Sequence, residues 1–152
     1  MDSDLRYDLV RSYRDLYKVL MTIFRQACEA VGLSLLEASI LKTVEDHPGL
    51  SLGELADALF MAESKCSVAV EQLHRQGLVE RTRSAEDRRR VVLSLTPAGR
   101  AAVNRLFGEG APLRRILEAS LDLSGEEMRR LIAANRTLTE NLRKHRGTPY
   151  EV

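Results

Sequence analysis

The stretch of residues 50–99 constrains the fold of this 152-residue chain more than any other part of it. It reads LSLGELADALFMAESKCSVAVEQLHRQGLVERTRSAEDRRRVVLSLTPAG. Two short helical patterns are separated by a break at Phe60–Met61, and Gly77 ends the second pattern before a strand. An arginine-rich turn then precedes the alternating run Val91–Leu95, which predicts a second strand paired with the first. Helix, turn, helix and a hairpin with a basic tip predict a winged helix-turn-helix.

The composition is that of an ordinary globular protein, with 30% charged and 44% hydrophobic residues. The formal net charge is only +1, so an argument for nucleic-acid binding must depend on where the arginines lie. No apolar run approaches the roughly 20 residues of a membrane helix, and the start MDSDLRYD lacks a signal-peptide pattern. We therefore expect a cytoplasmic protein with no membrane partner.

Residues 4–31 read as one long helix, because apolar side chains recur at steps of three and four. This apolar stripe is too long to be buried against a small winged helix, so part of it should meet another helix or another subunit. The last helix carries a second stripe near heptad spacing. We expect these two helices to form a dimer interface through Leu9, Tyr13, Leu16, Leu131, Leu138 and Leu142.

Local signals predict where the other helices begin and end. Capping boxes at Ser34/Glu37, Ser51/Glu54 and Ser124/Glu127 begin helices that run to about residue 46, to residue 59 and to the C-terminal region. A further helix should cover residues 62–76, and strands should cover 78–82 and 91–95. Thr96 and Pro97 begin another helix, and Gly108, Gly110 and Pro112 predict a break before the apolar stripe resumes to about residue 121.

These elements predict a mainly α fold with a small β-hairpin wing, a winged helix-turn-helix joined to a helical dimerisation region. The expected parts are an N-terminal dimerisation helix at 1–32, a DNA-binding domain at 33–99, C-terminal dimerisation helices at 100–145 and a flexible tail at 146–152.

Two neighbouring features of this stretch suit double-stranded DNA. A helix that exposes small polar and basic groups fits the major groove, and an arginine-rich hairpin tip fits phosphates or the narrow minor groove. Cys66, Val70 and Leu73 should face inward on the helix of residues 62–76. The candidate DNA-binding residues are those of its outer face and of the hairpin: Ser64, Lys65, Ser67, Val68, Gln72, Arg75, Arg83, Asp87, Arg88, Arg89 and Arg90.

The segment GLVERTRSAEDRRRVVLSLTPAGR resembles the wing signature of the MarR family of bacterial transcription regulators. The resemblance implies a homodimer whose N- and C-terminal helices interdigitate. It also implies that Arg89 enters the minor groove, oriented by Asp87, while Arg88 and Arg90 reach phosphates and Arg83 contacts the DNA backbone. A small ligand, bound where the DNA-binding and dimer helices meet, would change the spacing of the two recognition helices.

Four positions depart from the family pattern. Ala62 stands where a capping Ser or Thr is usual, Glu63 and Val68 stand where arginine is common, and Asp57 lies in a helix that is often basic. We expect weaker non-specific DNA binding than is usual for the family. These departures also keep open an alternative, a winged-helix protein-interaction module with weak or no DNA binding.

Other chemistries find less support. Cys28 and Cys66 favour apolar packing over redox sensing, since no feature that lowers a thiol pKa is nearby and neither matches the position of the family's sensing cysteine, early in the first helix. The histidines and cysteines match no metal-ligand spacing, and no catalytic motif is present, so we expect no metal, no cofactor and no enzyme. Tyr13, Tyr17 and Phe24 either line a ligand pocket or, as their spacing favours, contribute to a core or interface.

The sequence therefore predicts a regulator, more in keeping with a repressor, that binds a pseudo-palindromic duplex as a homodimer. Its two recognition helices would enter major grooves about 34 Å apart. We also expect a small-molecule effector.

Overall fold

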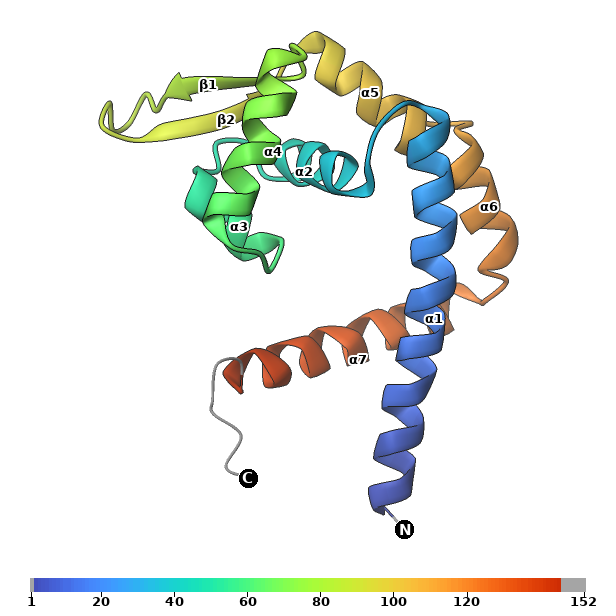
Figure 1. Cartoon of the computed structure of the whole chain (residues 1–152). Helices are drawn as coiled ribbons and strands as arrows, with labels where there is room; N and C mark the ends of the chain where they lie inside the picture. The colour runs from blue at the N-terminus through green and yellow to red at the C-terminus, as the bar shows by residue number, and fades with distance from the viewer. Residues whose placement is uncertain (1, 146–152) are drawn as a thin grey trace. The chain divides into compact units, whose positions relative to one another are not determined.

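The computed structural model describes residues 2–145, and the chain divides after Ile116 into two compact units. The predicted tail at 146–152 lies outside the described residues. The helices are mostly in the first unit, and the only two strands of the described chain pair there as a hairpin (Figure 1). In chain order the elements are α1 (Asp2–Ala30), α2 (Leu35–Asp46), α3 (Leu52–Ala58), α4 (Glu63–Arg75), β1 (Val79–Arg83), β2 (Val91–Leu95), α5 (Pro97–Phe107), α6 (Pro112–Ser120) and α7 (Gly125–Lys144).

This order confirms the predicted mainly α fold with a small hairpin, and the boundaries differ from the sequence prediction by one or two residues. The first strand begins at Val79, not Leu78, and Ala62 is the N-cap of α4, not its first residue. The break between α5 and α6 falls at residues 108–111, where glycines and Pro112 predicted it. The predicted division at residues 32 and 99 stays a prediction.

Capping boxes start α2, α3 and α7 as predicted. In α2 the Ser34 hydroxyl accepts a hydrogen bond from the Glu37 amide at 3.1 Å, and the Glu37 carboxylate accepts one from the Ser34 amide at 2.8 Å. Ser51 and Glu54 repeat this pattern at the start of α3. Each box satisfies backbone N–H groups that the helix itself leaves without acceptors.

The core of the first unit lies between α2, α3, α4, α5 and the hairpin. Its fully buried side chains include Ile40, Leu41, Leu55, Leu73 and Leu93. Ala102, Val103 and Leu106 of α5 join the same cluster, and so does Cys28 of α1. The helix after the hairpin is therefore a structural part of the winged helix.

The turn between α3 and α4 contains an unusual backbone conformation. Phe60 has φ +53°, the one non-glycine residue with positive φ in the described chain. A bulky side chain rarely adopts this left-handed conformation, which reverses the chain within one residue. The turn thus aims α4 across α3 without the glycine that such a reversal favours.

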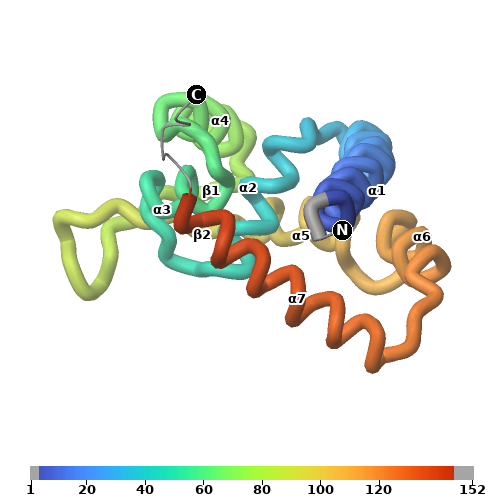
Figure 2. The backbone as a smooth tube through the Cα atoms, turned by 90° about the horizontal axis from the view of Figure 1, so that it is seen from below, coloured from blue at the N-terminus to red at the C-terminus, as the bar shows by residue number. Residues whose placement is uncertain are grey.

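The hairpin, which we call the wing (β1, β2 and the tip residues 84–90), extends away from the helices (Figure 2). Its register pairs Val79 with Leu95, Arg81 with Leu93, and Arg83 with Val91. Gly77, at φ +72°, lets the chain leave α4 and enter β1. At the base of the wing, Thr96 donates a hydrogen bond from its hydroxyl to the Gly77 carbonyl at 2.6 Å and so joins the two ends of the hairpin.

The second unit contains the end of α6 and the whole of α7, and no side chain of α7 is fully buried. Leu131 is 50% exposed and Leu142 is 71% exposed, whereas Leu138 is half-buried. On α1, in the first unit, Leu16 is 52% exposed and Leu9 is also exposed. Each apolar stripe thus remains open to solvent in the single chain.

Within residues 2–145, no single helix is long and apolar enough to cross a membrane. One pair of helices, Asp4–Ala30 and Leu35–Asp46, meets the criteria together by length and composition, with a bend of 91° between them.

Candidate nucleic-acid interface

The two faces of α4 differ as the sequence predicts. Cys66, Val70 and Leu73 are completely buried. Val68 is 70% exposed, and Ser67 is half-buried. Ala62 provides no side-chain cap, so the first amide groups of α4 have no side-chain acceptor from the N-cap. The outer face that the structure leaves exposed comprises Ser64, Lys65, Val68, Gln72 and Arg75.

The tip of the wing is shaped by short-range hydrogen bonds. The Ser84 hydroxyl accepts from the amides of Glu86 and Asp87 at 3.3 and 3.4 Å. The Asp87 carboxylate accepts from the Arg89 amide at 3.0 Å. This hydrogen bond holds the backbone at Arg89. The implied role of Asp87 in orienting Arg89 stays a prediction.

The arginines of the wing fall into two groups. Arg83 donates to the carbonyl of Arg88 at 3.0 Å, and the guanidinium groups of Arg81 and Arg90 form ion pairs with Glu71 and Glu54. Arg88 and Arg89 have no ion-pair partner within residues 2–145, and both are exposed. The sequence predicted only the capping role of Glu54 and neither of these two ion pairs, because the partners of each pair come from different elements.

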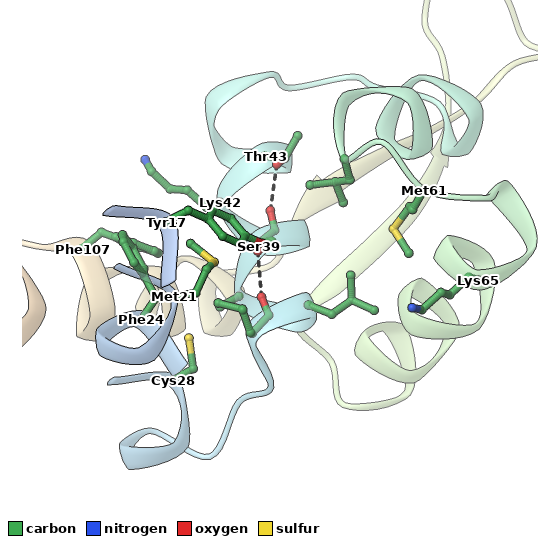
Figure 3. A pocket seen from close by; sticks show the side chains of 14 residues that line it. Tyr17, Met21, Phe24, Cys28, Ser39, Lys42, Thr43, Met61, Lys65 and Phe107 are labelled. Carbon is green, nitrogen blue, oxygen red and sulfur yellow. Dashed lines mark hydrogen bonds between the residues drawn. The ribbon is translucent and has the colours of Figure 1, made fainter. Parts of the chain in front are cut away.

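A cleft of about 600 Å³ lies beside α4, between α1, α2, the turn before α4 and the end of α5 (Figure 3). Phe24 and Phe107 contact each other at one side, with ring centroids 6.2 Å apart. Tyr17 and Phe24 line the cleft, whereas Tyr13 is not among its lining residues. The sequence pattern pointed to two of these aromatic residues but missed Phe107, which comes from a distant helix.

Two lysines reach this cleft from opposite sides, Lys42 from α2 and Lys65 from α4 (Figure 3). The Lys42 ammonium lies 5.9 Å from the centroid of the Phe107 ring and pairs with Asp46 at 2.7 Å and Glu45 at 3.0 Å. The hydrogen bond to Asp46 raises the pKa of Lys42, so this lysine is charged at neutral pH. Lys65 has no ion-pair partner in the described part of the chain.

Both cysteines are free and completely buried. Burial raises the pKa of each thiol, and the nearby carboxylates of Glu29 and Glu63 add to the effect at Cys28 and Cys66, respectively. A raised pKa disfavours the reactive thiolate, in keeping with the packing role expected from the sequence. Among the described residues, no group of three or more His, Cys, Asp or Glu side chains is arranged to hold a metal ion.

Comparison with known proteins agrees with this arrangement. Residues 31–90 match the model of the MarR family. A putative transcriptional regulatory protein for the hcr operon of Thauera aromatica is 38% identical over 93 residues, which cover 61% of this chain and 55% of that protein. Over residues 31–90 the chain is therefore similar to the MarR family. The chain thus spans about half the length of this Thauera protein.

Two solved structures share the fold over most of the chain. The transcriptional regulator BldR from Sulfolobus solfataricus superposes with a TM-score of 0.73 at 28% identity, covering 92% of this chain and 99% of that chain. Staphylococcus aureus MarR in complex with salicylate and kanamycin gives a TM-score of 0.77 at 20% identity, covering 92% and 93%. These similarities confirm the predicted winged helix-turn-helix and the family resemblance.

Proposed function

We propose that this MarR-family chain is a sequence-specific DNA-binding transcription regulator, acting as a repressor. One observation supports it above the others. The exposed face of α4 and the wing arginines without ion-pair partners in the described chain, Arg88 and Arg89, belong to neighbouring elements of the first unit. The α4 side chains suit base edges in a major groove, and the wing arginines suit phosphates or the negative potential of the minor groove.

The proposed roles follow from the chemistry of each side chain. Ser67 and Gln72 would hydrogen-bond base edges, and Val68 would pack on a thymine methyl group. Lys65 and Arg75 would contact phosphates. Glu63, at the start of α4, repels phosphates, so the wing supplies much of the electrostatic attraction.

The functional form that we propose is a homodimer on a pseudo-palindromic site. The support is the exposure of apolar side chains along α1 and, separately, along α7, since large exposed apolar patches mark interaction sites. The interface would include Leu9, Tyr13, Leu16, Leu131, Leu138 and Leu142. A two-fold axis would then present two α4 helices to grooves about 34 Å apart.

We further propose that the cleft between α1, α2, the turn before α4 and α5 binds a small-molecule effector. Its volume of about 600 Å³ is in the ordinary range of ligand pockets, and aromatic walls with the Lys65 ammonium, which has no ion-pair partner among the described residues, suit an aromatic anion. The S. aureus relative was solved with salicylate, a compound of that class. Because α1 and α4 both line the cleft, a ligand there would alter how α4 is held.

The proposed location is the cytoplasm, and the proposed activity is binding without catalysis. The alternative, a protein-interaction module that does not bind DNA, is not favoured, because the Thauera relative is named as a transcriptional regulatory protein.

The test is fluorescence anisotropy with duplex from the protein's own upstream region and with scrambled duplex, over a series of salt concentrations. We expect tighter binding to the upstream duplex with a steep salt dependence. Arg89→Ala should weaken binding to both duplexes and reduce the magnitude of the log–log salt slope by about 0.9 per lost phosphate contact. Gln72→Ala is the matched control, which should change the preference between sequences and leave the slope unaltered. Equal weak binding of the wild type to both duplexes would contradict the proposal for this site.

A further inference from the structure

The wing is attached to the start of α3 at two points. The backbone amide of Leu93 in β2 donates to the carbonyl of Leu50 at 2.8 Å, immediately before the N-cap of α3. Arg90, the residue immediately before β2, forms an ion pair through its guanidinium with the carboxylate of Glu54. The first contact holds the middle of β2, and the second holds the end of the tip, next to Arg88 and Arg89.

The carboxylate of Glu54 is also held by the capping box of its own helix. It is the third residue of α3, and its Oε2 accepts a hydrogen bond from the Ser51 amide at 2.8 Å. The same oxygen contacts Arg90. One carboxylate therefore joins the capping box of a helix to the tip region of a hairpin 36 residues away in sequence.

A second ion pair ties the wing to α4. Arg81 of β1 lies 3.4 Å from the Glu71 carboxylate, which also pairs with Arg75 at 3.3 Å. The two helices of the helix-turn-helix thus each provide one carboxylate that pairs with the wing. Glu54 of α3 pairs with Arg90, and Glu71 of α4 pairs with Arg81. Arg88 and Arg89, which have no ion-pair partner within residues 2–145, lie between these two attachments along the hairpin.

We propose that Arg90 is a positioning residue that holds the wing against α3 through Glu54, so that Arg88 and Arg89 are presented to DNA. This inference rests on the proposed DNA-binding function. It reassigns Arg90, whose expected role from the sequence was contact with phosphate. Glu54 then supports DNA binding although it carries the charge that DNA repels.

The proposal can be tested by the direction in which neutralising Glu54 changes the affinity for DNA. The hydrogen bond from Ser51 and the Arg90 guanidinium lower the pKa of Glu54, so the pair is fully charged at neutral pH. If Glu54 only added negative charge near the DNA, its neutralisation would strengthen binding. If it holds the wing, its neutralisation weakens binding. The two accounts therefore predict opposite changes in affinity.

The experiment compares Glu54→Gln with Glu86→Gln, a matched neutralisation of a wing carboxylate that has no ion-pair partner in the described chain. Glutamine preserves the capping box, so α3 stays intact. We expect Glu54→Gln to bind the upstream duplex about threefold to fivefold more weakly, as the loss of a half-exposed ion pair allows. Glu86→Gln should bind as tightly as the wild type or more tightly. Arg90→Gln should weaken binding to the same extent as Glu54→Gln without reducing the salt slope.

Limited trypsin digestion supplies a measurement that needs no DNA. Glu54→Gln leaves every arginine in place, so faster cleavage within the wing reports its release from α3, whereas Glu86→Gln should be cleaved at the wild-type rate. Unchanged or tighter DNA binding by Glu54→Gln, or an unchanged cleavage rate, overturns the inference. If the wild type binds no duplex, the proposed function fails, and the digestion alone still decides whether Glu54 holds the wing.

Discussion

Two glycines at the base of the wing are required for different physical reasons. Gly77 adopts φ +72°, and an added Cβ would meet nothing within 4 Å. Gly99, at the start of α5, has an ordinary φ, but its Cβ would lie 2.1 Å from the carbonyl oxygen of Leu78. At Gly77 the constraint is backbone conformation, and at Gly99 it is the close approach of α5 to the chain entering β1.

We expect Gly77→Ala to lower the free energy of unfolding by about 1 kcal/mol, because a residue with a Cβ is strained in the left-handed backbone conformation. Gly99→Ala should lower it by about 3 kcal/mol, since backbone must move to relieve the overlap. Urea denaturation of both variants beside the wild type measures this difference. Equal losses would show that α5 shifts freely and that the close approach to Leu78 is not a constraint.

At the scale of elements, the capping boxes show how side chains two or three positions apart set a helix boundary. In α7 the Ser124 amide and hydroxyl both donate to the Glu127 carboxylate, at 2.9 and 2.6 Å. These hydrogen bonds lower the pKa of Glu127, with the larger contribution from the side chain of Ser124. The ionised form is favoured, so its stabilisation of α7 is fully present above the ordinary glutamate pKa. It is lost as the pH falls through the lowered value.

The prediction for this element is that Ser124→Ala raises the pKa of Glu127 toward its ordinary value. Carboxyl-carbon NMR over an acid titration measures it directly, and Glu126, one position earlier on the same turn, serves as the internal reference. A titration of Glu127 that Ser124→Ala does not move would mean that the capping box is not formed in solution.

At the scale of the whole molecule, no apolar side chain of α7 is fully buried among the described residues. Leu131, Leu138 and Leu142 recur on one stripe, and two of them are at least half exposed. In a monomer this stripe would remain in contact with water, which disfavours a stable isolated chain. A second copy of the chain covers such stripes in a symmetric interface.

We therefore expect the double variant Leu131→Glu/Leu142→Glu to sediment as a monomer in analytical ultracentrifugation. Its affinity for a two-half-site duplex should fall, because each chain then binds its half-site alone. Lys144→Gln, on the polar side of α7, is the control and should leave the sedimentation coefficient unchanged. A double variant that sediments like the wild type would place the interface elsewhere.

The sequence by itself determined the elements and the inner face of α4. Caps such as Ser34/Glu37, stops such as Gly77 and the spacing of Cys66, Val70 and Leu73 act over a few residues, so their signals can be read locally. The same reading identified the winged fold and the MarR resemblance. It assigned Arg90 to DNA together with Arg83, Arg88 and Arg89, because a local pattern does not show which carboxylates a hairpin will meet.

The tertiary structure decided what depends on residues brought together from distant segments. Arg90 and Glu54 are 36 residues apart in sequence, and their pairing separates Arg90 from Arg88 and Arg89. Phe24 and Phe107 meet across α1 and α5 to wall the cleft, and Gly99 approaches Leu78 only after α5 folds back on β1. Such contacts form through the packing of whole elements, since the geometry of that packing, and not the identity of neighbouring residues, brings the partners within reach.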